Sequence, residues 1–290
     1  MIPLIFSILS SSLIFVLFKL FPKYNIDTFQ AIVFNYFTAF ICGILLFGNE
    51  WNPIALNVGQ WPFFVAISAI IFISLFLLMG ISSQKNGVAL TSIAVKMSMA
   101  ISMLFMIMLY RETLSPLKIS GILLAFLGVF LVSFSKSEGR NTNSSLWMLL
   151  ILFIGSGFLD FILNYVQKFE MQYLTPSLFS AFGFGLAGII GLLILIYLIR
   201  AKKTVFSPRS LVAGIILGIP NYFSIYLLIV SYKSTGWNDS TVLAIINVSV
   251  VMITSIIGFI AFKENITIRK IIGLLAAVSA IVLLYFANLN

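Results

Sequence analysis

Lys96 stands inside a long apolar stretch, SIAVKMSMAIS, where charged side chains are rare. If the apolar run over 88–109 is a membrane helix, Lys96 lies near the bilayer middle, where a lysine costs about 2.5–3.5 kcal/mol on insertion scales. We therefore expect its ammonium group to face a water-filled cavity and to bind an anionic group of a ligand, such as a carboxylate. A structural ion pair and snorkelling to the membrane surface are the alternatives. The residues that share its helical face, three, four and seven positions away, are Ser92, Met99, Ala100 and Met103.

Asp160 is the only carboxylate well inside an apolar run. The helical rise places Asp160 about 22 Å and Lys96 about 12 Å from the same membrane surface, so we expect two levels of one cavity and no direct ion pair. Asp160 is also a candidate carrier of a coupling proton, with a hydrogen-bonded structural role as the alternative. It belongs to a polar stripe that should point inward and that contains Ser156, Gly157, Asn164 and Gln167.

Polar residues in three other runs are further candidates to bind the same ligand. Asn221 follows Pro220, which frees a backbone carbonyl in the middle of its run. For each asparagine, an interhelical hydrogen bond is the alternative. The full set of predicted substrate-binding residues is Lys96, Asn35, Tyr36, Asp160, Asn164, Asn221, Tyr222 and Asn247.

The composition is that of an integral membrane protein. Of 290 residues, 61% are hydrophobic and only 9% are charged, whereas soluble domains carry about 25% charged residues. The net charge of +9 comes from basic residues in short loops, which favours contact with anionic lipid and no nucleic-acid partner. The chain has no histidine and a single cysteine, Cys42, so we expect no metal site, no cofactor and no enzyme chemistry.

Short polar breaks divide the chain into ten apolar runs, each long enough to cross a bilayer as a helix. The loops between them are too short to hold a soluble domain. The first run lacks a preceding basic segment and is expected to be a retained span. The predicted fold is therefore an all-α polytopic membrane protein with ten transmembrane helices, over about 2–19, 28–47, 61–81, 88–109, 116–134, 145–166, 176–199, 209–231, 240–262 and 268–287.

The sequence also repeats itself. Residues 110–134 align without a gap with residues 262–286, at an offset of 152 residues. Two five-helix repeats, 1–136 and 145–290, are therefore predicted within one membrane domain. Because five is odd, the second repeat is inverted, an architecture that places a transport site at the midplane between the halves. The aligned pairs include Glu112 with Glu264, Gly121 with Gly273 and Lys118 with Lys270, while Lys96 aligns with Val248, next to Asn247.

The chain resembles the drug/metabolite transporter superfamily, in its EamA-like branch. The shared features are ten spans, the 5+5 repeat, and a basic residue followed by glutamate just before a span that contains spaced glycines. The resemblance implies a central cavity lined by spans 1–4 and 6–9, with spans 5 and 10 at the periphery. It also implies export or exchange of small metabolites, often amino acids. The resemblance depends on Arg111, Glu112, Gly121 and Gly128 in the first repeat and on Lys263, Glu264 and Gly273 in the second. At the position that aligns with Gly128, the second repeat has Ala280.

These patterns predict a secondary transporter that exports or exchanges small polar metabolites, such as amino acids, by alternating access. The chain has no G-x-x-x-x-G-K-[ST] nucleotide motif that would supply energy from ATP. A multidrug exporter of lipophilic compounds is one alternative, which the fixed cation Lys96 disfavours; a channel or non-catalytic membrane subunit is another. The expected partners are the transported molecule and lipid, the expected unit is a monomer, and the expected location is a bacterial inner membrane.

The side of the membrane that holds the termini is predicted differently by two arguments. Twelve basic residues lie in loops or near span ends on the side opposite the termini, and four lie on the termini side. The positive-inside rule then places both termini outside, whereas the resemblance implies that both are inside.

Overall fold

A computed structural model describes residues 1–48, 59–110, 115–133, 142–169, 175–235, 239–264 and 267–287. These residues are almost entirely helical. The helices are α1 (Ile2–Leu20), α2 (Thr28–Phe47), α3 (Trp61–Lys85), α4 (Val88–Met97), α5 (Met99–Tyr110), α6 (Pro116–Ser133), α7 (Thr142–Phe169), α8 (Pro176–Arg200), α9 (Pro208–Ser234), α10 (Asp239–Ile260) and α11 (Ile268–Ala287), with a short 3₁₀ helix, η1 (Phe21–Tyr24), after α1.

The helices form ten spans, which confirms the all-α polytopic fold predicted from the sequence. α4 and α5 are two parts of one span, and each other α-helix is a span of its own. Within the described residues, six segments are long and apolar enough to cross a bilayer, and shorter apolar segments lie in α4–α5, α6 and α10. Helix starts follow ordinary capping rules: Asp27 accepts a hydrogen bond from Gln30 N at 2.9 Å at the start of α2.

The fourth span differs from the continuous helix that was predicted, because it is interrupted at Ser98. The Ser98 hydroxyl donates back to the carbonyl of Val95, and Ile101 N donates to Ser98 O at 2.9 Å, three residues back. Bonds of this spacing tighten the turn, and a serine that bonds back to its own helix bends it. α4 and α5 therefore meet at a turn in the middle of the membrane.

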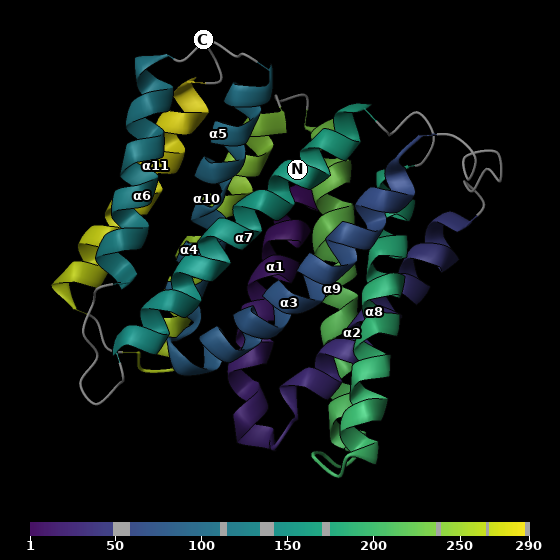
Figure 1. The fold of residues 1–290 in the computed structure, drawn as a ribbon. Coiled ribbons are helices and arrows are strands. Elements are labelled where there is room, and N and C mark those ends of the chain that lie inside the picture. Colours follow the sequence, from purple (N-terminus) through teal and green to yellow (C-terminus); the bar gives the residue numbers. More distant parts are fainter. Residues whose placement is uncertain are drawn as a thin grey trace.

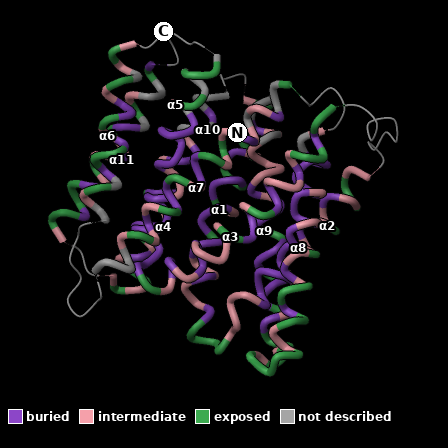
Figure 2. Tube along the Cα trace, viewed as in Figure 1, coloured by how far each residue is buried: buried purple, intermediate pink, exposed green. Residues whose placement is uncertain are grey.

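Eight spans surround the centre of the bundle, and α6 and α11 pack against each other at one edge (Figure 1). At that edge Gly128 permits close approach, because a Cβ there would lie 3.1 Å from both Ala277 N and Gly273 O. Buried residues are most frequent in the central part of the bundle, and exposed residues are more frequent on the outer helices and at helix ends (Figure 2). α6 and α11 are the fifth and tenth spans, and their place at the edge of the bundle is the one that the resemblance implies.

Helix contacts follow the pattern expected of two related halves. α2 packs on α8, α4 on α10 and α6 on α11, so three spans contact the span five positions later. Six further contacts between the predicted halves form three corresponding pairs: α2 with α9 and α3 with α8, α1 with α9 and α3 with α7, and α1 with α10 and α4 with α7. The boundaries of the two repeats, 1–136 and 145–290, stay a prediction.

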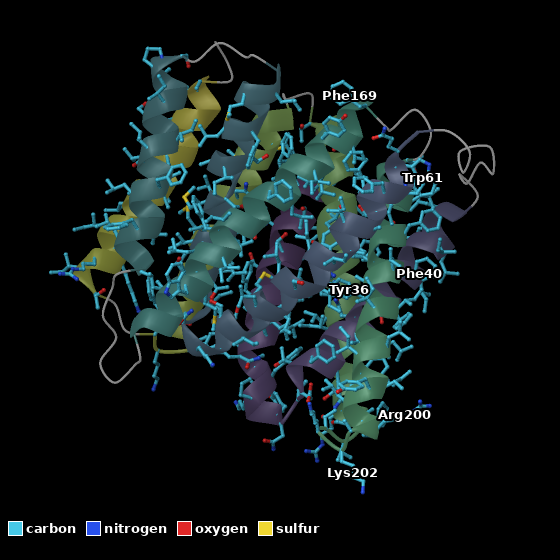
Figure 3. The ribbon with its side chains drawn as sticks, in the orientation of Figure 1. Tyr36, Phe40, Trp61, Phe169, Arg200 and Lys202 are labelled. Carbon is cyan, nitrogen blue, oxygen red and sulfur yellow. The ribbon has the colours of Figure 1, made fainter. Side chains whose placement is uncertain are left out.

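Polar side chains join the two predicted halves at the end of the bundle where α1 ends and α4 begins. Glu264 accepts a hydrogen bond from Val88 N at 2.7 Å, at the start of α4, and lies 3.9 Å from Lys19 Nζ. Gln30 of α2 bonds to Val205 O at 2.8 Å, in the segment between α8 and α9. Arg200 and Lys202 lie at this same end, opposite Trp61 (Figure 3). Glu264 thus has a structural position at a helix start, and Glu112 lies outside the described residues.

Candidate functional site

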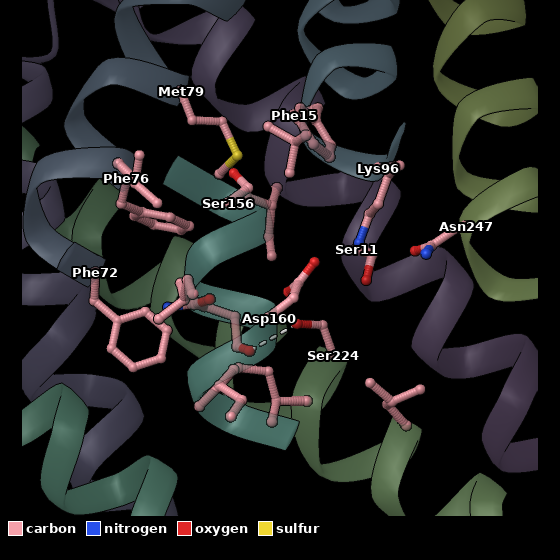
Figure 4. A pocket seen from close by; sticks show the side chains of 18 of the residues that line it. Ser11, Phe15, Phe72, Phe76, Met79, Lys96, Ser156, Asp160, Ser224 and Asn247 are labelled. Atoms are coloured by element: carbon pink, nitrogen blue, oxygen red, sulfur yellow. Dashed lines mark hydrogen bonds between the residues drawn. The ribbon is translucent and has the colours of Figure 1, made fainter. Parts of the chain in front are cut away.

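A cavity of about 240 Å³ lies between the eight inner spans. Residues of α1, α2, α3, α4, α7, α8, α9 and α10 line it. These are the spans that the resemblance places around a central cavity. Three of its polar lining residues come from different helices: Lys96 from α4, Asp160 from α7 and Asn247 from α10 (Figure 4).

Lys96 and Asp160 both line this cavity but do not form a direct ion pair. Both belong to the described part of the chain, and their charged groups are farther apart than the 4.0 Å limit of a salt bridge. Lys96 is half-buried and Asp160 is exposed. Asp160 points into the space between the helices, with Lys96 across it (Figure 4). The two opposite charges are therefore held near one another with room between them for a ligand or water.

The close approach of α7 to α5 places Asp160 beside the break in the fourth span. Gly157 permits it, because a Cβ there would lie 2.6 Å from Ile101 Cβ and 2.7 Å from Ser98 O. One helical turn later, Asp160 Oδ2 lies 3.2 Å from the Ser98 hydroxyl. That hydroxyl has a single proton and two acceptors, Val95 O and Asp160, so it can donate fully to only one of them. A proton on Asp160 would let the carboxyl donate to Ser98 while Ser98 donates to Val95.

Replacing Gly157 with alanine is expected to disrupt this arrangement. The added methyl group must push α7 away from α5, because its nearest neighbours are a branched side chain and a backbone carbonyl. Overpacking of this kind costs about 1–3 kcal/mol of stability. We expect a lower melting temperature in detergent and reduced transport. Gly155→Ala is a matched control on the same helix, because it meets only the flexible end of Leu75; equal effects of the two changes would contradict the account.

Five of the eight predicted site residues line the cavity: Lys96, Tyr36, Asp160, Asn221 and Asn247. Two do not. Asn35 is fully buried in α2, where Gly214 and Gly218 of α9 approach its backbone, and Tyr222 is buried on α9, near Gly43 of α2. The side chain of Asn164 lies outside the described residues.

The two cavity asparagines differ in their hydrogen bonds. Asn247 donates to the sulfur of Met99 at 3.4 Å, a weak interhelical bond between α10 and the start of α5. Asn221 Nδ2 is buried and has no hydrogen-bond partner among the described residues. A buried amide without a partner costs free energy, so Asn221 is a donor that a ligand in the cavity can satisfy.

Of the residues expected beside Lys96 on one helical face, Ser92, Met99 and Ala100 do not line the cavity. Ser92 instead accepts a hydrogen bond from Thr254 of α10 at 2.6 Å, and Ala100 is fully buried. The interior of the bundle includes seams between helices as well as the cavity. Ser92 lies in the seam between α4 and α10, and the turn at Ser98 redirects the residues that follow.

Sequence reasoning missed two serines of α1 and most of the aromatic residues that line the cavity. Ser7 and Ser11 of α1 are four residues apart and share one face, so helical periodicity could have identified them. Ser7 donates to Ser224 O of α9 at 2.8 Å. The phenylalanines gave no comparable signal, because phenylalanine is common throughout this sequence. The missed lining residues include Ser7, Ser11, Phe72, Phe76 and Phe184.

Comparisons with known proteins agree with this architecture. An uncharacterized protein of Haemophilus influenzae is 30% identical to this chain over 292 aligned residues, covering 98% of each protein. The sequence profile of the EamA-like transporter family matches residues 2–134. The chain belongs to the EamA-like transporter family. An uncharacterized transporter of Bacillus subtilis, YyaM, is 29% identical over 119 residues, 41% of this chain and 38% of that protein.

The fold of this EamA-like transporter is also similar to a solved structure. A crystal structure with 12% sequence identity superposes with a TM-score of 0.60, covering 98% of this chain and 99% of that one. The family match covers residues 2–134. The second half of the cavity wall, with Asp160, Asn221 and Asn247, comes from residues beyond that match.

Proposed function

We propose that this EamA-like transporter carries a small zwitterionic metabolite, such as an amino acid, by alternating access around its central cavity. The observation that supports the proposal best is the pair of opposite charges, Lys96 and Asp160, on the cavity wall without a direct ion pair. Charges in a membrane interior are costly unless a partner compensates them. A bound zwitterion compensates both, its carboxylate with Lys96 and its ammonium with Asp160.

The other parts of the proposal follow from the family and the fold. We propose export or exchange as the direction, with a coupled proton on Asp160 or the substrate gradient as the energy source. The protein is proposed to act as a monomer, as a transporter and not as an enzyme, in a bacterial inner membrane. Two relatives come from bacteria, which supports a bacterial membrane as the location.

Two alternatives lead to different results in transport assays. An exporter of lipophilic compounds would not need the fixed cation of Lys96, although the many apolar residues of the cavity wall are compatible with it. A channel would pass its substrate without saturation and without counterflow. A carrier shows both saturation and acceleration by substrate on the opposite side.

The test is a counterflow screen with purified protein in liposomes. Vesicles loaded with one unlabelled amino acid are diluted into a trace of the same labelled compound, and label uptake is followed. We expect transient, saturable accumulation for a subset of neutral amino acids. Flux of amino acids without saturation would favour a channel, and transport of lipophilic cations alone would favour the multidrug alternative; either result would overturn the proposal.

A further inference from the structure

Four aromatic rings form a continuous wall at one side of the cavity. Tyr36 of α2 lies 5.6 Å from Phe76 of α3 and 5.7 Å from Phe184 of α8, measured between ring centroids. Phe184 in turn lies 5.1 Å from Phe72 of α3. All four rings line the cavity. The wall therefore joins the first and second predicted repeats through ring contacts, and its inner surface is apolar.

The charged residues lie at the opposite side. In the close view, Phe72 and Phe76 project from one side of the space, and Lys96 and Asn247 from the other, with Asp160 between them (Figure 4). A ligand that fills the cavity therefore meets Lys96 and Asn247 on one side and Phe72 and Phe76 on the other. This separation of polar and aromatic residues restricts which side chains a bound zwitterion can have.

We propose that the transported zwitterion has a large apolar side chain, of leucine size or larger, and that the aromatic wall selects it. This inference rests on the proposed function and narrows its substrate class. With the ligand's charged groups held between Lys96 and Asp160, its side chain extends toward Tyr36, Phe72, Phe76 and Phe184. A large apolar side chain that packs against this wall is itself removed from water, and this gain grows with the apolar area buried.

Small and polar side chains are disfavoured for separate reasons. Glycine or alanine would bring little apolar area to the wall and would leave the space beside the half-buried Phe76 unfilled. A charged or amide side chain would lose its hydrogen bonds to water against a wall of rings. The wall carries one polar atom, the Tyr36 hydroxyl, which is buried and has no hydrogen-bond partner among the described residues. That hydroxyl can accept or donate one hydrogen bond to a ligand, but it cannot replace a full hydration shell.

The experiment is competition by a series of amino acids with one backbone and different side chains. Glycine, alanine, leucine, phenylalanine and glutamine each compete against a labelled compound that the wild-type protein exchanges in liposomes. One methylene in an apolar pocket is worth about 10- to 200-fold in discrimination. We expect leucine and phenylalanine to compete at least about ten-fold better than glycine, alanine or glutamine.

Variants then assign that preference to the wall. Phe76→Ala is expected to lower the preference for leucine over glycine to less than about three-fold, with glycine competition unchanged. Phe76 is chosen because it is half-buried, and Phe76→Leu is a milder second variant. Tyr36→Phe keeps the ring and should keep the preference. Phe158→Ala is the matched control, because Phe158 is 41% exposed and packs on Phe105 outside the cavity.

The outcomes separate this inference from the proposed function. If glycine or glutamine competes as well as leucine, the cavity carries zwitterions without the proposed selection, and only the inference is overturned. A preference that survives Phe76→Ala and Phe76→Leu unchanged also overturns it. If no zwitterion is exchanged or competes, the proposed function fails and the inference fails with it.

Discussion

Replacing Lys96 with methionine is expected to reduce counterflow of zwitterions by about 10- to 100-fold, mainly through a raised KM. Methionine has a similar length and no charge, so the cavity keeps its shape and loses its cation. A hydrogen bond to a charged group contributes about 1.5–3 kcal/mol. Loss of this hydrogen bond between Lys96 and the substrate carboxylate accounts for the expected weakening of binding by about 10- to 100-fold. Counterflow in liposomes at several substrate concentrations measures it.

Two further variants show whether the charge is responsible. Lys96→Arg keeps a cation with a different shape and should retain part of the activity. Lys85→Met is the matched control, because Lys85 is exposed at the end of α3 and does not line the cavity. Full affinity for zwitterions in Lys96→Met would show that this lysine does not bind the substrate.

Replacing Asp160 with asparagine is expected to leave exchange in place but to remove its dependence on pH. In the wild type, a proton and the substrate ammonium compete for the same carboxylate, so substrate affinity should fall as pH is lowered. The charged group that faces Asp160 is Lys96, and the hydrogen-bond partner of Asp160 is Ser98. An asparagine cannot be protonated, and its amide can donate to Ser98 as a protonated carboxyl would.

The measurements are exchange at several pH values and accumulation driven by an imposed pH gradient. The asparagine variant should exchange substrate with a KM raised by about ten-fold, because its amide oxygen binds an ammonium more weakly than a carboxylate does. It should not accumulate substrate in response to the pH gradient. If the variant keeps the pH dependence of the wild type, Asp160 does not carry the coupled proton.

The spans were predictable from the sequence because each apolar run ends at polar, proline or glycine residues. α2 covers the predicted range 28–47, and α11 covers the predicted range 268–287. The interruption at Ser98 was not predictable. A single serine in an apolar helix has no distinctive pattern, and the contact of Ser98 with Asp160 joins residues 62 positions apart in the chain.

The site was partly predictable, because charges inside apolar runs are few and must face a polar region. That argument identified Lys96 and Asp160 correctly as cavity residues. It could not separate neighbours such as Tyr36, which lines the cavity, from Asn35, which lies in a helix seam. Consecutive residues on a helix point in directions about 100° apart. In a bundle of ten spans both directions can be interior, so periodicity alone does not tell a cavity wall from a packed interface.

The most direct test of the central claim is chemical restoration of the charge at position 96. In a Cys42→Ser background, Lys96→Cys introduces the only thiol, and water-soluble methanethiosulfonates are added to liposomes that contain the protein. The aminoethyl reagent places an ammonium group near the original position, whereas the methyl reagent adds only neutral atoms. We predict that the unmodified variant exchanges zwitterions poorly, that substrate slows its labelling, and that only the aminoethyl reagent restores exchange. A thiol that cannot be labelled from water, or equal restoration by the neutral reagent, would contradict a cation on the wall of a water-filled transport cavity.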